Sequence, residues 1–193
     1  MMPRVYFDIE AVVAVEDTGM SAPVLRGRML ALLHPLFAAK PHTYALAIPA
    51  GRQVFCDKGG GMVRIFASGR EDLDALAASL AQLPWMRDYA RLHYPVAVPE
   101  DYGGAWVAFR RYRIPTLKSD RKTGAEAGQL RQRRMLDMQK EKMDYFVVNS
   151  KSTGQHFTLA VRREPGTPPQ AECLPNSYGL CSAHNFFCVP DLP

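Results

Sequence analysis

The first hundred residues alternate between the two-residue period of β-strands and the 3.6-residue period of amphipathic helices. Runs of β-branched and aromatic residues indicate the strands, and leucines at helical spacing indicate the helices between them. The expected strands are residues 4–13, 43–49, 62–68 and 88–98, and the expected helices are residues 21–39 and 70–83. This β-α-β-β-α-β order is typical of a ferredoxin-like domain, in which both helices cover one face of an antiparallel sheet.

The pattern changes after the glycines at 103 and 104. A strand at 106–113, a polar loop, a helix at 127–143, strands at 145–149 and 156–163, a Pro-rich loop at 164–176 and a tail with a short strand are expected there. The leucines and methionines of the helix do not gather on one side, so its own core contacts would anchor it poorly. We therefore expect an α+β protein with a ferredoxin-like domain at 1–100 and a C-terminal α/β part at 101–193 that carries this helix.

The positive charge of the chain is concentrated in one stretch. The formal net charge is +5. Residues 106–143 contain eleven Lys and Arg but only four Asp and Glu, so the rest of the chain is close to neutral. A basic stretch on a near-neutral protein suggests a polyanionic partner, although a solvated charged helix explains the charge equally well.

Several classes of protein are disfavoured by motifs that the sequence lacks. No apolar segment approaches the ~20 residues of a membrane span, and the N-terminal residues do not resemble a signal peptide, so we expect a cytoplasmic protein. No metalloprotease, serine-hydrolase or nucleotide-binding motif is present, and no carboxylate cluster suggests a two-metal nuclease. The cysteines form no CxxC pair, which favours reduced thiols over a C-terminal zinc site with His184. We therefore expect neither a metal nor another cofactor.

Histidine, serine and tyrosine side chains remain as candidates for chemistry. His34 lies near the end of the first expected helix at the edge of its apolar face, where a histidine is more often a partly buried surface residue than a catalyst. The turn at 150–155 contains three hydroxyls, a lysine and a glycine between two strands. Such a turn can present N–H groups and hydroxyls to a phosphate, but an ordinary polar hairpin has the same composition.

Six arginines near the second half of the chain could bind RNA. They are Arg110, Arg111 and Arg113 at a strand end, and Arg131, Arg133 and Arg134 on the expected helix. An arginine-rich helix that enters the deep groove of an RNA hairpin from its end could contact phosphates and guanine edges. Phe157 could stack on the last base pair of a stem, or it could pack in the core.

The chain resembles a known family of RNA-processing enzymes in four segments. These are the run SKSTGQHF at 150–157, the strand ending in Arg162 and Arg163, the YGL at 178–180, and the FCVP at 187–190. Together with the Leu33–His34 pair on the first helix, they are similar to the CRISPR repeat-processing endoribonuclease of type I-F systems. The resemblance covers most of the chain, and the combination of STGQHF with YGL is its most specific part.

The resemblance implies binding of the repeat hairpin, cleavage at the 3′ base of its stem, and retention of the product in a surveillance complex with other subunits. Cleavage would proceed by attack of a 2′-hydroxyl on the adjacent phosphate, leaving a 2′,3′-cyclic phosphate without help from a metal. His34 falls at the position of the general base, Ser150 at that of the serine that places the attacking hydroxyl, and Tyr178 at that of the tyrosine that orients the histidine. The resemblance also places Arg111 at a base-reading arginine, Phe157 at a stacking phenylalanine, and Ser152 and Thr153 near the scissile phosphate. The full set of expected RNA-binding residues is Arg110, Arg111, Arg113, Arg131, Arg133, Arg134, Ser152, Thr153, Gln155 and Phe157.

The resemblance leaves the roles of some residues open. Arg113 stands where the resemblance leads us to expect a glutamine that reads purines of the stem, and the arginine of 127–143 that enters the groove is not fixed. A subunit that binds the hairpin without cutting it is an alternative, as is a protein of a plasmid or transposon CRISPR system. A single-strand binder of the RRM type has the same element order, but residues 62–68 contain one aromatic residue and do not match its RNA-binding motif.

Overall fold

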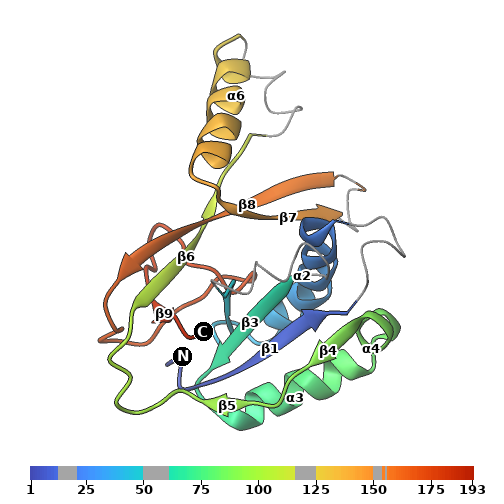
Figure 1. The fold of residues 1–193 in the computed structure, drawn as a ribbon, viewed down its shortest axis with the longest axis vertical. Coiled ribbons are helices and arrows are strands. Elements are labelled where there is room, and N and C mark those ends of the chain that lie inside the picture. The colour runs from blue at the N-terminus through green and yellow to red at the C-terminus, as the bar shows by residue number, and fades with distance from the viewer. Residues whose placement is uncertain (13–20, 50–60, 116–124, 150–153, 155) are drawn as a thin grey trace.

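The computed structural model describes residues 1–12, 21–49, 61–115, 125–149, 154 and 156–193, which form two antiparallel sheets and four helices (Figure 1). One sheet contains β1 (Val5–Ala11), β2 (Ala45–Ala47), β3 (Met62–Ala67), β4 (Ala90–Leu92) and β5 (Val96–Ala97). The other contains β6 (Trp106–Tyr112), β7 (Asp144–Asn149), β8 (His156–Gly166) and β9 (Val189–Pro190). The helices are α2 (Ala22–Ala39), α3 (Arg70–Ala81), α4 (Pro84–Tyr89) and α6 (Ala125–Lys140). The expected α+β class is therefore confirmed.

The first sheet has the strand order β2-β3-β1-β4, with β5 also paired to β1. The single strand expected at 88–98 is wrong in part. Residues 88 and 89 belong to α4, and within this segment only β4 and β5 pair with β1. Pro84 occupies the first turn of α4, where a proline is favoured because the missing N–H has no helical partner. Pro95 lies between β4 and β5 and cannot donate to the strand ladder, which explains the interruption.

Side chains alternate between the two faces of the first sheet. Phe7 of β1 pairs with Ile65 of β3 on one face, and both are fully buried. On the opposite face, Arg64 forms two hydrogen bonds with Asp8, of 2.7 and 2.9 Å, and donates to the Leu192 carbonyl. The last residues of the chain therefore cover this face and satisfy a buried cation.

Helix α2 belongs to both halves of the molecule, because it packs directly on β7 of the second sheet (Figure 1). Gly27 allows this close approach: a Cβ at this position would lie 1.8 Å from the Val147 carbonyl oxygen. The preceding residue, the buried Arg26, forms a salt bridge with Asp144 of β7, with 3.1 Å between a guanidinium nitrogen and a carboxylate oxygen. These two contacts hold the N-terminal half of α2 directly against the second sheet.

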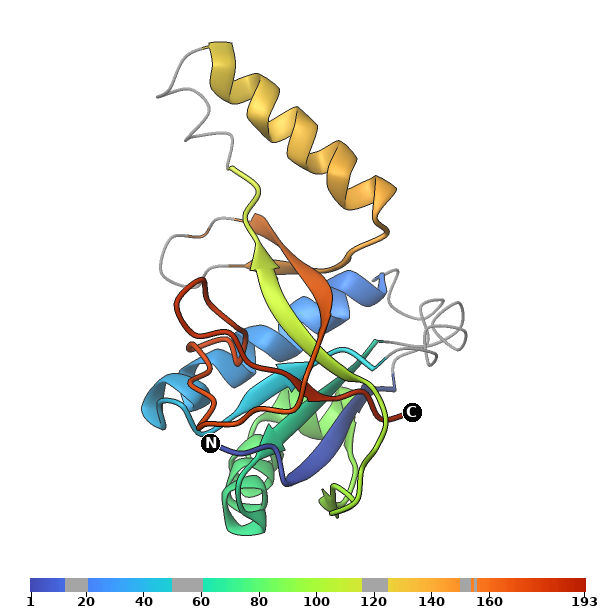
Figure 2. The ribbon, with the colours of Figure 1, turned by 90° about the vertical axis from the view of Figure 1, so that its left-hand side faces the viewer.

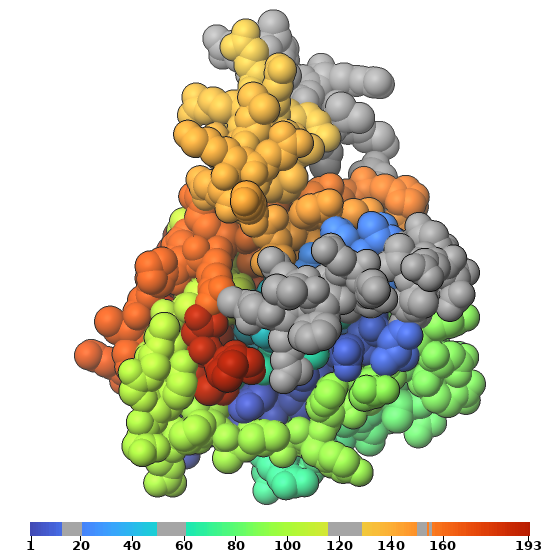
Figure 3. Space-filling model, in the orientation of Figure 1, coloured from blue at the N-terminus to red at the C-terminus, as the bar shows by residue number. Residues whose placement is uncertain are grey.

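Helix α6 projects from the second sheet at one end of the molecule, as the ribbon and the space-filling view show (Figures 2 and 3). Among its described side chains, residues 129–140, only Met138 is buried. Polar contacts near its C-terminal end supplement this anchor: Asp137 accepts a hydrogen bond from Tyr112, and Glu141 pairs with Arg162. The weak apolar anchoring expected from the sequence is confirmed. None of the helices in the described ranges has the length and hydrophobicity that crossing a membrane requires.

Candidate functional site

His34 is held in one tautomer by a backbone contact. It lies on α2, partly buried, with Nδ1 2.8 Å from the carbonyl oxygen of Ser177. A carbonyl oxygen can only accept, so Nδ1 carries the proton and, in the neutral ring, Nε2 carries the free lone pair. No hydrogen bond to Nε2 is formed by any side chain or backbone group that the structure describes. The ring is therefore presented as a base through Nε2.

Tyr178 stacks on this imidazole. The two ring centroids lie 4.3 Å apart and the ring planes differ by only 6°. A parallel ring at this distance restricts rotation of the imidazole about its Cβ–Cγ bond. The stacking and the hydrogen bond to Ser177 together fix the direction in which Nε2 points.

The loop that carries Tyr178 is fixed by hydrogen bonds at several points. The side-chain oxygen of Asn176 accepts from the backbone N–H groups of Tyr178 at 2.8 Å and Leu180 at 3.2 Å, forming an Asx-type turn. The Gly179 carbonyl accepts from the N–H of Leu46 on β2 at 2.8 Å. Gly179 has φ +75°, and a Cβ there would lie 2.8 Å from the Leu46 nitrogen, so this position requires glycine. The YGL segment is thus locked against the first sheet.

Arg111 on β6 reaches the same cluster. Its guanidinium carbon lies 5.9 Å from the ring centroid of Tyr178 and 5.9 Å from that of Phe157 on β8. Burial lowers the pKa of Arg111 from its usual value, the neighbouring charge of Arg113 lowers it further, and Tyr178 opposes the shift. The group stays protonated at neutral pH, since an arginine loses its proton only at very high pH. No carboxylate of the described residues pairs with Arg111, which leaves a partly desolvated cation available to an anion.

A groove of about 650 Å³ opens beside this cluster. Its lining comes from the C-terminal end of β6, the loop 176–183, Arg134 of α6 and Arg162 of β8, and five of the lining residues are arginines. The lining residues are Arg110, Arg111, Tyr112, Arg113, Arg134, Arg162, Asn176, Ser177, Tyr178, Cys181, Ser182 and Ala183. Because Ser177 and Tyr178 both line the groove and contact His34, the histidine lies directly behind one wall.

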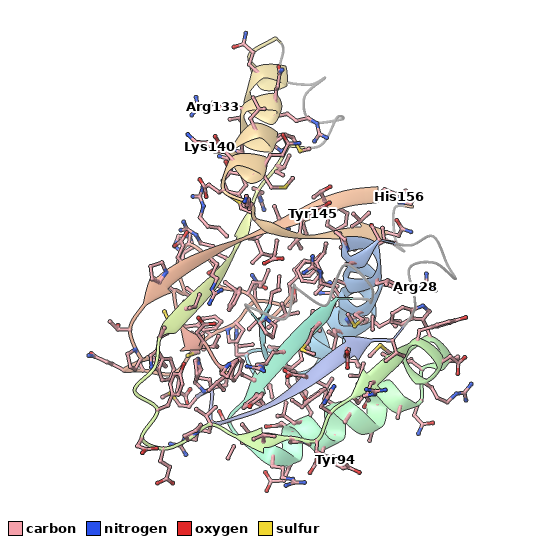
Figure 4. The ribbon with its side chains drawn as sticks, viewed as in Figure 1. Arg28, Tyr94, Arg133, Lys140, Tyr145 and His156 are labelled. Atoms are coloured by element: carbon pink, nitrogen blue, oxygen red, sulfur yellow. The ribbon has the colours of Figure 1, made fainter. Side chains whose placement is uncertain are left out.

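The three helix arginines have different environments. Arg131 donates to the Pro115 carbonyl, and Arg134 donates to the Arg113 carbonyl at 2.8 Å, so both tie α6 to the segment after β6. Arg133 is exposed and projects from the same side of α6 as Lys140 (Figure 4). Of the three, Arg133 is therefore the one whose guanidinium faces solvent without such a backbone bond.

Tyr112 and Arg162 are two of the groove residues that the sequence did not point to. Tyr112 lies between two guanidinium groups, with the carbon of Arg134 5.2 Å and that of Arg162 4.7 Å from its ring centroid. Arg162 also forms two hydrogen bonds with Glu141, of 3.1 and 2.9 Å. Arg110 and Arg162 are directly opposite each other in the β6–β8 pairing, so strand alternation in a correct register would have placed them with Tyr112 on one face.

The structure describes only some of the remaining expected site residues. Arg110 lines the groove but already pairs with Glu164 at 2.7 Å. The strands β7 and β8 pair with Asn149 opposite His156, as expected for strands that flank the turn. Ser150, Ser152, Thr153 and Gln155 lie outside the described residues, so their roles stay predictions.

The C-terminal cysteines are buried free thiols in the described structure. Burial raises the pKa of Cys173 and of Cys181 to about 11, so both stay protonated at neutral pH. Within the described ranges, no group of three His, Cys, Asp or Glu side chains is placed to hold a metal ion. The zinc site considered with His184 has no such cluster in this part of the chain.

The chain matches one family of known proteins over nearly its whole length. A family model described as "CRISPR-associated protein (Cas_Csy4)" matches residues 6–191, which include His34, Tyr178 and all of the residues that line the groove. A comparison with curated proteins found no match.

Proposed function

The chain belongs to the Csy4 family of CRISPR-associated proteins, endoribonucleases that process CRISPR repeat RNA, and we propose that it cuts the repeat transcript at the 3′ base of its hairpin. The cut is an attack of the 2′-hydroxyl on the adjacent phosphate. The new P–O2′ bond replaces the P–O5′ bond, which leaves a 2′,3′-cyclic phosphate and a 5′-hydroxyl. The reaction requires no metal ion.

His34 takes the proton of the attacking hydroxyl through Nε2. This role is supported by the hydrogen bond from Nδ1 to Ser177, which leaves the opposite nitrogen as the acceptor. A positioned general base typically contributes about 10²–10⁴-fold in rate. Tyr178 keeps the imidazole in the required plane, and Ser150, next to the last residue of β7, orients the attacking hydroxyl.

The RNA stem lies along the arginine-lined groove and α6. Arg111, which has no carboxylate partner in the described structure, contacts the base of the stem, and Arg133 enters its groove from the exposed side of α6. Phe157 stacks on the terminal base pair. Arg110, Arg113, Arg131 and Arg134 complete the positive field, and Ser152, Thr153 and Gln155 hold the scissile phosphate.

The observation that carries this proposal is the tautomer of His34. The hydrogen bond to Ser177 leaves the lone pair on Nε2, and Tyr178, which stacks on the imidazole, lines the groove. In functional terms, residues 1–100 supply the base and residues 101–193 bind the RNA. After cutting, the protein stays on the mature RNA and joins other subunits of a surveillance complex in the cytoplasm.

A substituted RNA tests the proposed reaction. The repeat RNA of the protein's own locus is incubated with the protein in EDTA, beside the same RNA with a single 2′-deoxy nucleotide at the cut site. We expect one cut with a cyclic phosphate end in the first RNA and none in the second, with equal binding of both. A 2′-deoxy nucleotide elsewhere in the stem serves as control. Binding of every RNA without a cut would instead indicate a non-cleaving hairpin-binding subunit, and cutting of the deoxy RNA would exclude 2′-hydroxyl attack.

A further inference from the structure

His42 is held in a backbone conformation that a histidine rarely adopts. It follows α2 with φ 62°, in the left-handed region, and among the described non-glycine residues only Lys142 shares this feature. Glycine adopts this conformation freely, and asparagine tolerates it better than other residues with a Cβ. Backbone strain of this kind persists where the surrounding contacts maintain it, and it occurs often at functional sites.

The side chain of His42 makes a specific contact with the loop that carries Tyr178. Its Nδ1 lies 2.9 Å from the carbonyl oxygen of Pro175, two residues before the Ser177 carbonyl that binds His34. His34, in the second half of α2, and His42, just after the helix, thus donate hydrogen bonds to the two carbonyls on either side of Asn176. These two hydrogen bonds hold the loop at Pro175 and at Ser177.

The contact at Pro175 fixes the entrance of this loop. Proline has no N–H, so its carbonyl is the one backbone group through which Pro175 can form a hydrogen bond. In the described structure, the bond to that carbonyl comes from His42. Residues 176–180 are then held by the Asn176 turn and by Leu46. The contact at Pro175 is therefore one of the points that hold Tyr178 over His34, and it is the one at the start of the loop.

We propose that His42 is a positioning residue of the cleavage reaction, which holds the loop 175–180 so that Tyr178 stays stacked on His34. The proposal rests on the proposed function of His34 and Tyr178. Among the described residues, no hydrogen bond or ring contact joins His42 to His34, and His42 does not line the groove, so we place its effect in the loop.

Three variants of the full chain separate this role from backbone strain. His42→Gly removes the hydrogen bond and relieves the left-handed strain at the same time. His42→Asn is the conservative rescue, because its amide nitrogen lies the same number of bonds from the backbone as Nδ1 and asparagine tolerates this φ. Lys142→Gly is the matched control, since it relieves the other strained position of the described chain without touching the loop.

The test combines NMR, the cutting rate, RNA affinity and thermal stability. NMR of the imidazole protons of His34 reports the stack directly, because a parallel tyrosine ring shifts these signals upfield. The single-turnover rate of cutting the repeat RNA reports the reaction, and binding of RNA with a 2′-deoxy nucleotide at the cut site reports affinity. We expect His42→Gly to lose the upfield shift and to cut roughly 10-fold more slowly, as preorganisation is lost, with unchanged affinity and no loss of thermal stability. We expect His42→Asn to restore much of both, and Lys142→Gly to behave as wild type.

An unchanged His34 signal in His42→Gly would overturn the proposal, because the stack would then not depend on this bond. Normal cutting despite a lost stack would overturn it as well, as would a rate lost only in proportion to affinity. If the wild-type protein does not cut the repeat RNA, the proposed function fails, while the NMR comparison still decides whether His42 holds Tyr178 over His34.

Discussion

Replacement of Gly27 by alanine tests whether direct contact between α2 and β7 sets the distance across the site. The added Cβ would lie 1.8 Å from the Val147 oxygen and 2.5 Å from its carbonyl carbon, both of them backbone atoms that cannot rotate away. Reaching even 3.0 Å requires the helix and strand to separate by more than about 1 Å. Overpacking of this kind costs about 1–3 kcal/mol, whereas alanine gains only about 1 kcal/mol over glycine in a helix interior.

We therefore expect Gly27→Ala to lose up to about 2 kcal/mol of stability, which lowers Tm by roughly 4–8 °C in a chain of this size. His34 lies on α2 and Phe157 on the strand paired with β7, so the same shift moves the base relative to the RNA. A displacement of about 1 Å can cost on the order of 10²-fold in rate. Thermal unfolding and single-turnover cutting measure the two effects.

Gly103→Ala is the matched control for this prediction. Its Cβ would meet nothing closer than the Asp101 oxygen at 3.9 Å, so the same chemical change should leave Tm and cutting unaltered. A Gly27→Ala protein that melts and cuts like the wild type would refute the reasoning, because the helix–strand contact would then not determine the geometry of the site.

The other predictions concern the loop, the groove and the buried thiols. Gly179→Ala should destabilise the protein by about 1–3 kcal/mol and slow cutting, measured by unfolding and single-turnover rates, because its φ of +75° disfavours a side chain. Arg111→Ala should weaken RNA binding by roughly 1–3 kcal/mol in a filter-binding titration; an unchanged Kd would remove Arg111 from the interface. Glu141→Gln should tighten RNA binding, because it frees Arg162 in the groove; weaker binding would show that the pair serves only to hold α6. Since burial raises the pKa of Cys173 from 9.0 to about 11, the folded state binds more protons than the unfolded state in this interval. The unfolding free energy should therefore fall between pH 9 and 11, and less steeply in Cys173→Ala.

Periodicity was sufficient to predict most elements, because strand and helix patterns reflect burial of one face. It failed at 84–97, where prolines start a short helix and interrupt a strand inside an apolar-rich segment. The partners of the arginines could not be predicted for a different reason. Arg131 and Arg134 bind backbone carbonyls, and Arg162 binds Glu141, through contacts that depend on how α6 crosses the second sheet.

In the candidate site too, some residues could be predicted from the sequence and some contacts could not. The resemblance pointed to His34 and Tyr178, and the structure stacks them. The contact of His42 with Pro175 had no signal in the sequence, because it requires a left-handed φ and a loop more than 130 residues away in the chain.

The most direct test of His34 as the base uses His34→Asn. The asparagine amide lies where Nδ1 lies, so it can keep the hydrogen bond to Ser177, but it has no counterpart of Nε2. The measurement is the single-turnover rate on the repeat RNA in EDTA, with protein in excess. General base catalysis by Nε2 predicts a fall of about 10²–10⁴-fold with unchanged RNA affinity. A His34→Asn protein that cuts at the wild-type rate would show that another group takes the proton.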